Sequence, residues 1–208
     1  MLERLIDLDT QVFWWINSHH NPIADWTLWT LSQGWSWSIV LVVLLTYALR
    51  KNPTENWWLL IMGIGLCFLL GDRISVMCFK DVVCRLRPCH ALEGVRMFHT
   101  HCGGQYGFVS SHAANVAALA MFFYLRCRHI PRTTKRYWLG IGLWVWALAV
   151  MYSRPYLGKH YPGDVICGGL LGLGLGVVAW LVIEKIQQTI INRKSIKLST
   201  TQKKDEKK

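Results

Sequence analysis

The stretch SRPYLGKHYPGD, from Ser153 to Asp164, gathers an arginine, a lysine, a histidine and an aspartate within a hydrophobic chain. His160 and Asp164 are four residues apart, a spacing that puts two side chains on one face of a helix. Pro162 between them is compatible with a first helical turn. Asp164 could keep one imidazole nitrogen protonated, which leaves the other free to attack an electrophile. The spacing therefore predicts a histidine nucleophile with an orienting carboxylate.

Three basic residues indicate what this nucleophile attacks. Lys80 and Arg87 belong to the segment KDVVCRLRP, and Arg154 precedes His160 in the chain. Cations gathered at the edge of apolar segments are costly, and they repel one another. A phosphate dianion bound among them would offset both costs, and the planar guanidinium of arginine fits phosphate oxygens in a bidentate manner. We therefore predict that Lys80, Arg87 and Arg154 bind a phosphate group.

A third segment, FVSSHAAN, adds further candidate residues for a phosphate site. Ser110 and Ser111 precede His112 at the start of an apolar stretch. Hydroxyl and backbone N–H groups at the N-terminus of a helix form a ready anion site, so the two serines are candidate phosphate ligands. A histidine at this position could protonate a leaving oxygen. We therefore expect His112 to act as a general acid beside His160.

The composition indicates which elements position these residues. Hydrophobic residues make up 52% of the 208-residue chain and charged residues 17%, which is typical of an integral membrane protein. We expect an all-α membrane bundle of five to six spans, with Gly168, Gly172 and Gly176 allowing close helix packing in the last of them. The expected spans are Trp26–Leu49, Trp57–Phe79, His112–Leu125, Tyr137–Tyr152 and Val165–Ile183.

The two ends of the chain receive separate predictions. Residues 2–20 have apolar side chains near helical spacing and acids between them, which favours an interfacial amphipathic helix; a sixth, weakly hydrophobic span is the alternative. We expect residues 1–190 to form the membrane-embedded domain and residues 191–208 to be a basic, disordered tail.

Charge distribution predicts the orientation. The net charge of +11 is concentrated in short runs beside apolar segments, as the positive-inside rule produces, and it does not indicate nucleic-acid binding. These runs at Arg50–Lys51, 126–136 and the C-terminal tail share one side under alternating spans. We therefore predict a multi-pass protein of the plasma (inner) membrane with a cytosolic C-terminus. The three segments described above then lie together on the extracytoplasmic face, which is periplasmic in a Gram-negative envelope.

The motifs K-x6-RP, SxH and SR-x5-H-x3-D, in this order between Lys80 and Asp164, resemble the signature of the type 2 phosphatidic acid phosphatase superfamily of membrane lipid phosphatases. The first and third fit completely. In the middle motif the family usually has Pro-Ser-Gly-His, whereas this chain has VSSH, so Ser111 replaces a glycine. The spacing of the apolar segments also resembles that family.

The resemblance implies a metal-independent lipid phosphatase that needs no cofactor. His160 would be the nucleophile that becomes phosphohistidine, Asp164 its partner, and His112 the acid. The phosphate ligands would be Lys80, Arg87, Ser110, Ser111 and Arg154. The expected substrate is a membrane lipid phosphate, with undecaprenyl diphosphate or a lipid A phosphate ahead of phosphatidylglycerol phosphate and phosphatidic acid. The loop from Ala91 to Gly107 is the expected reader of the headgroup. The oligomeric state does not follow from the sequence.

Two alternatives stay open. The loop that contains Cys84, Cys89, His90, His99, His101 and Cys102 could bind a metal, although its spacing matches no common zinc motif. In an oxidising compartment Cys89 and Cys102 could instead form a disulfide, or the thiols could remain free. Asp72 and Arg73 could also indicate an ion path in a non-enzymatic transporter or channel, although an interfacial ion pair beside Lys80 is the simpler interpretation.

Overall fold

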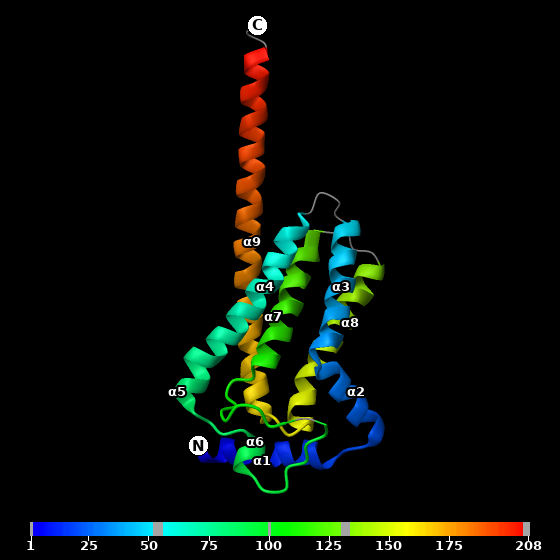
Figure 1. Cartoon of the computed structure of the whole chain (residues 1–208), viewed down its shortest axis with the longest axis vertical. Coiled ribbons are helices and arrows are strands. Elements are labelled where there is room, and N and C mark those ends of the chain that lie inside the picture. Colours follow the sequence, from blue (N-terminus) through cyan, green and yellow to red (C-terminus); the bar gives the residue numbers. More distant parts are fainter. Residues whose placement is uncertain (1, 52–55, 100, 130–133, 206–208) are drawn as a thin grey trace.

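The computed structural model describes residues 2–51, 56–99, 101–129 and 134–205, and every regular element in these ranges is helical. The expectation of an all-α fold is confirmed for this part of the chain. Its only β-type pairing is the isolated bridge between Leu86 and Tyr106. Figure 1 shows a bundle in which α3 (Gly34–Lys51), α4 (Trp57–Ile74), α7 (Ser111–Arg126), α8 (Thr134–Tyr156) and α9 (Pro162–Asp205) run side by side.

Among the described residues, two helices are long and apolar enough to cross a bilayer by length and composition, namely α4 with its continuation and α9. The first continues through the π-helix η1 (Ser75–Lys80) and α5 (Asp81–Val83), which makes an unbroken stretch from Trp57 to Val83, and the second qualifies over Pro162–Arg193. A third span is possible if α2 (Pro22–Ser32) and α3 are counted together.

The segment predicted as one span from Trp26 to Leu49 is broken. Helices α2 and α3 meet at an angle of 66°. Gln33 between them has an extended backbone, with φ −81° and ψ 143°, and Gly34 follows it. An extended residue cannot continue the helical hydrogen bonds, so the predicted span consists of two helices that pass the length and composition test only together.

Helix α7 occupies the centre of the bundle. Its small side chains from Ala113 to Ala120 are almost all inaccessible to solvent. They pack against α9, where Gly168, Gly172 and Gly176 face α7 so closely that a methyl group at any of the three would overlap the backbone of Ser110, Ala114 or Ala118. The glycine spacing therefore serves close helix packing, as predicted.

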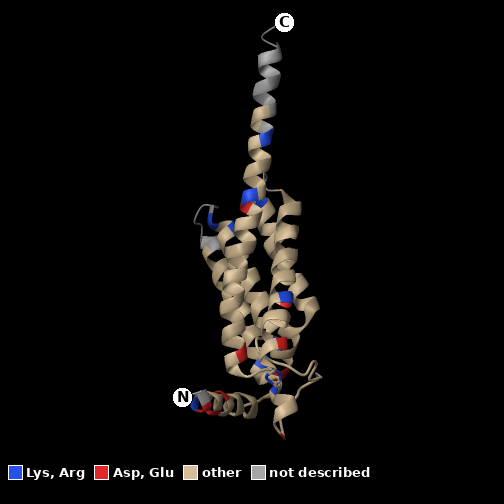
Figure 2. Cartoon of the chain, turned by 90° about the vertical axis from the view of Figure 1, so that its left-hand side faces the viewer, with Lys and Arg blue, Asp and Glu red and all other residues tan. Residues whose placement is uncertain are grey.

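Helix α1 (Leu2–Ser18) lies across the end of the bundle, roughly perpendicular to the other helices (Figure 1). Phe13, Ile16 and Asn17 are buried against the bundle, whereas Leu5, Leu8 and Trp15 are more than half exposed. An apolar face turned away from the protein is typical of a helix that lies in a membrane interface. Figure 2 shows that charged residues are sparse in the middle of the bundle and gather near α1.

The domain boundary at residue 190 and the disordered tail stay predictions. Helix α9 continues as a single helix to Asp205 and extends beyond the rest of the bundle (Figure 1). After Gly176 the sequence contains neither glycine nor proline, so nothing local ends the helix. Residues 206–208 lie outside the described ranges.

Candidate active site

Five segments meet at the end of the bundle beside α1 and bring the predicted residues together. Lys80 ends η1, and Arg87 immediately precedes the short helix α6 (Pro88–Ala91). Ser110 caps α7, and Ser111 and His112 form its first turn. Arg154 lies in the last turn of α8, whereas His160 is in the loop before α9 and Asp164 in the first turn of α9. Residues separated by 84 positions in sequence therefore share one site.

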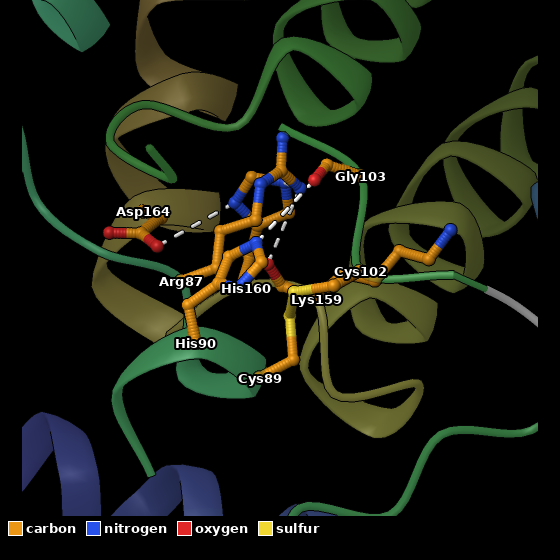
Figure 3. Close-up of a disulfide and its surroundings, with 8 residues drawn as sticks. All are labelled: Arg87, Cys89, His90, Cys102, Gly103, Lys159, His160 and Asp164. Atoms are coloured by element: carbon orange, nitrogen blue, oxygen red, sulfur yellow. Dashed lines mark hydrogen bonds and ion pairs between the residues drawn. A yellow bond between two sulfur atoms is a disulfide. The ribbon is translucent and has the colours of Figure 1, made fainter. Parts of the chain in front are cut away.

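His160 is fully buried and held between two ionic groups (Figure 3). Its Nε2 lies 3.0 Å from Nη1 of Arg87, and its Nδ1 lies 3.6 Å from Oδ2 of Asp164. A guanidinium only donates hydrogen bonds, so Nε2 is the acceptor and the Nδ1 proton faces Asp164. The 3.6 Å distance is too long for a hydrogen bond, although it keeps the carboxylate beside the ring.

Electrostatics keep this imidazole neutral. Burial, followed by the positive charges of Arg87, Arg154 and Lys80, holds the pKa of His160 well below its usual 6.5. A neutral imidazole keeps a lone pair on Nε2, which here accepts the hydrogen bond from Arg87. The arrangement therefore gives His160 the protonation state that a nucleophile requires.

Four cations at the site have no carboxylate partner among the described residues: Arg87, Arg154 and Lys80 act on His160, and Lys159 acts on His112. Within the part of the chain that the structure describes, Lys80, Arg87, Arg154 and Lys159 form no ion pair with an acidic side chain. Arg154 is 2% exposed. The Nε atoms of Arg87 and Arg154 are also buried without a hydrogen-bond partner. Buried cations normally have a counter-charge, so this cluster is arranged to receive an anion.

The serine segment joins this cluster at the N-terminus of α7. Ser110 is buried, and its side chain caps the helix by accepting a hydrogen bond from the backbone N–H of Ala113 at 3.5 Å. Ser111 accepts a hydrogen bond from Nζ of Lys80 at 2.7 Å, and its hydroxyl lies 2.6 Å from that of Ser75. The π-helix η1 carries both Ser75 and Lys80, which is consistent with the frequent occurrence of π-helical turns at functional sites.

His112 lies near the same cations, in the first turn of α7. Its half-buried ring packs edge-on against Trp37, with the ring centroids 5.3 Å apart. Arg154, His160, Lys159 and Arg87 are all within electrostatic range of it. His112 and His160 therefore share Arg87 and Arg154 as neighbouring cations.

The backbone around Arg87 is held by hydrogen bonds to the end of the loop from Ala91 to Gly107. The N–H of Arg87 donates to the carbonyl of Gln105 at 3.1 Å, and the N–H of Gly107 donates to the carbonyl of Arg85 at 2.8 Å. A disulfide between Cys89 and Cys102, with Cα atoms 5.9 Å apart, closes the loop just beyond this pairing (Figure 3).

The metal-binding alternative finds no support in the described residues. Cys89 and Cys102 are used by the disulfide, and Cys84 is a free, exposed thiol. No group of three or more histidine, cysteine, aspartate or glutamate side chains in the described ranges is placed to hold a metal ion. Asp72, considered above as part of an ion path, accepts a hydrogen bond from Asn115 at 3.0 Å.

Sequence reasoning missed four residues that the structure places at or beside the site. Lys159 could have been found, because it directly precedes His160 in the nucleophile segment. Arg85 could have been found as an additional cation inside KDVVCRLRP. Ser75 and Asp9 gave no signal, because they reach the site only through the π-helix and through the docking of α1.

The site combines a neutral buried histidine, a carboxylate beside it and a cluster of cations without carboxylate partners, carried on a bundle of apolar helices. These features fit the class of membrane phosphatases that act on lipid phosphates. The comparisons agree. The chain matches the PAP2 superfamily over residues 56–188, and it belongs to that family. The chain is therefore a membrane lipid phosphatase.

The relatives that the chain resembles are named as phosphatases or diphosphatases of membrane lipids. The chain is 32% identical to lipid A 4'-phosphatase of Bacteroides thetaiotaomicron over 188 residues, which cover 87% of this chain and 78% of that protein. It is 26% identical to undecaprenyl-diphosphatase of Sulfolobus acidocaldarius, over 90% of this chain and 87% of that one. The fold is similar to that of the PAP2-type phosphatidylglycerolphosphate phosphatase of Bacillus subtilis, with a TM-score of 0.65 at 20% identity over 90% and 88% of the two chains.

Proposed function

We propose that this chain hydrolyses the phosphate of a lipid A headgroup at the extracytoplasmic face of the plasma (inner) membrane, through a phosphohistidine intermediate. The observation that carries the chemistry is the pair of His160 contacts, with Arg87 at Nε2 and Asp164 beside Nδ1. The similarity to lipid A 4'-phosphatase over most of both chains supports the substrate. The similarity to undecaprenyl-diphosphatase, at lower identity, makes an undecaprenyl diphosphate the second candidate.

The proposed reaction has two steps. In the first, the bound phosphate dianion offsets the cations around His112, which then carries a proton as imidazolium. Nε2 of His160 attacks phosphorus, the bond to the lipid oxygen breaks, and His112 gives its proton to that oxygen. In the second, His112 takes a proton from water as the oxygen of that water attacks phosphorus, and the bond between phosphorus and Nε2 breaks. Phosphate leaves and His160 is restored. The four cations stabilise the charge that spreads over the phosphoryl oxygens in both steps.

The proposal includes a membrane topology. We propose five crossings, by the α2–α3 pair, by α4 with η1 and α5, and by α7, α8 and α9. The site and α1 would lie at the outer interface. The ends of α3 and α7, the start of α8 and the extension of α9 lie at the opposite end of the bundle (Figure 1). The basic residues flanking these ends support a cytosolic location for them.

The first test is phosphate release by detergent-purified protein in excess EDTA. Lipid A, undecaprenyl diphosphate, phosphatidylglycerol phosphate and phosphatidic acid would be offered separately. We expect release from lipid A to exceed release from the others, and His160→Ala to abolish it. His19→Ala, which removes an exposed histidine that follows α1 and contacts the carbonyl of Trp15, is the matched control and should retain activity. Release that persists in His160→Ala would disprove the proposed mechanism, and a preference for undecaprenyl diphosphate would replace the proposed substrate.

A further inference from the structure

Helix α1 reaches the active site through one carboxylate. Asp9 uses both of its oxygens: Oδ2 lies 2.7 Å from Nη2 of Arg85, and Oδ1 accepts a hydrogen bond from the backbone N–H of Gly163 at 2.7 Å. Gly163 belongs to the first turn of α9, so Asp9 also caps that helix. Asp9 lies outside residues 56–188, which match the PAP2 superfamily.

Arg85 carries the contact from Asp9 to the nucleophile pair. Its Nη1 donates to Oδ1 of Asp164 at 2.8 Å while its Nη2 holds Asp9. Its guanidinium also stacks over the ring of Tyr161, 4.0 Å from the centroid. Two carboxylates therefore neutralise Arg85, which separates it from the unpaired cations that face the phosphate. Its planar fork is suited to fixing the positions of both acids at once.

Asp164 is left with one oxygen for catalysis. Oδ1 is held by Arg85, whereas Oδ2 accepts a hydrogen bond from the N–H of Tyr161 at 3.1 Å and faces Nδ1 of His160 at 3.6 Å. A small rotation of this carboxylate would change which oxygen faces the imidazole. The contact between Arg85 and Asp164 prevents that rotation, and Asp9 in turn fixes Arg85.

The local sequence is adapted to this arrangement. A side chain at position 163 would meet the carboxylate of Asp9 at 2.9 Å, so Gly163 leaves the space that Asp9 occupies. Asp9, Phe13 and Asn17 follow one another at four-residue intervals on the inner face of α1. Phe13 packs edge-on against Tyr161, with centroids 5.5 Å apart, and Asn17 donates to the carbonyls of Arg96 and Tyr156 at 3.0 and 2.9 Å.

We propose that Asp9 and Arg85 are positioning residues that hold Asp164 against His160, so that the docking of the interfacial helix α1 completes the active site. The inference rests on the proposed function, because it needs His160 to be the nucleophile. Asp9 acts only through Arg85 and the start of α9, so it should influence the chemical step and leave the binding of phosphate by the four cations unchanged.

The experiment compares Asp9→Asn with Asp7→Asn, which removes an exposed acid from the same helix. We expect Asp9→Asn to lower kcat about tenfold to a hundredfold, as misplaced catalytic groups do, with KM within about threefold of the wild type. Asp9→Glu keeps the charge and should recover part of the loss. Asp7→Asn should match the wild type. Equal kcat values for Asp9→Asn and Asp7→Asn would overturn the proposal.

A binding measurement separates positioning from folding. Orthovanadate can form a five-coordinate adduct with a nucleophilic imidazole, whereas inorganic phosphate needs only the cations. Stabilisation of the purified protein against thermal unfolding would be recorded with each anion. We expect Asp9→Asn to weaken the effect of vanadate and to leave that of phosphate intact. Equal weakening of both, with a lower Tm in their absence, would indicate a merely structural role and overturn the proposal.

The two hypotheses fail differently. If His160→Ala retains the activity of the wild type, the proposed function fails and Asp9 has no nucleophile to position. If His160→Ala is inactive while Asp9→Asn has the kcat and vanadate response of Asp7→Asn, the proposed function stands and only the role of Asp9 is overturned.

Discussion

Nη1 of Arg87 lies 3.0 Å from Nε2 of His160, so the guanidinium covers the nitrogen that we propose as the nucleophile. A guanidinium has no lone pair to accept a proton, and this contact therefore fixes the imidazole tautomer with its proton on Nδ1. An incoming phosphate dianion offers Arg87 a stronger acceptor than a neutral imidazole. Substrate binding would then turn Arg87 from Nε2 to the phosphate and expose the lone pair as the phosphorus arrives.

Arg87→Lys tests this exchange. Lysine keeps the charge but is a single point donor that cannot hold the imidazole and then grip two phosphate oxygens. We expect kcat/KM to fall about tenfold to a hundredfold, corresponding to the loss of a hydrogen bond between charged groups. Steady-state kinetics on the preferred lipid measure the change. Arg73→Lys, on an exposed residue of α4, is the control, and a loss of similar size there would contradict the specific role of Arg87.

The lowered pKa of Lys159 predicts that kcat/KM depends on pH. Burial, together with the charges of Arg154 and Arg87, lowers the pKa of Lys159 to about 8. Lysine is charged below its pKa, so its attraction for phosphate is present below pH 8 and is lost as pH rises through that value. Because kcat/KM reports the free enzyme, we expect kcat/KM to decline above pH 8.

Lys159→Arg supplies the matched comparison, because arginine remains charged throughout this range. The alkaline decline of kcat/KM should move to higher pH in the variant. An unchanged pH profile in Lys159→Arg would mean that another group causes the decline. The acidic side of the profile should also be wide, because the lowered pKa of His160 keeps the imidazole neutral below pH 6.5.

The sequence predicted those contacts of the site whose residues are close in the chain, and it missed contacts between distant segments. His160 and Asp164 are four residues apart at the start of a helix, so their proximity followed from helix geometry alone. Lys80, Arg87 and Arg154 were grouped because alternating spans place their segments on one face. The contact between Asp9 and Arg85 spans 76 positions and depends on how α1 docks, which no periodicity or motif encodes.

The span boundaries show the same limit. The apolar pattern from Trp26 to Leu49 is interrupted at Ser32, Gln33 and Gly34, a local signal that the prediction did not use. The 66° angle between α2 and α3 at this point could not be read from it. The pattern also does not separate a helix that faces lipid from one buried by its neighbours, such as α7. Composition therefore predicted the helical class, whereas the angle at the break required tertiary structure.

Ser111 is where this chain departs from the usual family motif, and its hydroxyl makes a testable network. It joins Nζ of Lys80 at 2.7 Å and the Ser75 hydroxyl at 2.6 Å. We expect Ser111→Ala to raise KM severalfold with a smaller change in kcat, because Lys80 loses the partner that aims it at the phosphate. Ser75→Ala should have a weaker effect, since it leaves the contact between Ser111 and Lys80.

The double variant decides whether these groups act as a unit. If Ser75 acts only through Ser111, then Ser75→Ala with Ser111→Ala should resemble Ser111→Ala alone in KM. Strictly additive effects on the free energy of substrate binding would show that Ser75 and Ser111 are independent, and would contradict the network.

The disulfide between Cys89 and Cys102 is expected to support the site through the backbone of Arg87. Cys89 is two residues after Arg87, and Cys102 is three before Gln105, whose carbonyl accepts the hydrogen bond from the N–H of Arg87. With a sequence separation of 13, the bridge should stabilise the protein by about 3 kcal/mol in the loop-entropy account. We expect the Cys89→Ser, Cys102→Ser double variant to lower Tm and to reduce kcat/KM.

Cys84→Ser provides the control for this prediction, because Cys84 is an exposed free thiol in the same region of the chain. A reducing agent should reproduce the loss of kcat/KM in the wild type and in Cys84→Ser, and it should have no further effect on the double variant. If the reducing agent inhibits the double variant equally, its target is not this disulfide. If the double variant retains wild-type Tm and kcat/KM, the pairing between Arg87 and Gln105 holds the site without the covalent bridge.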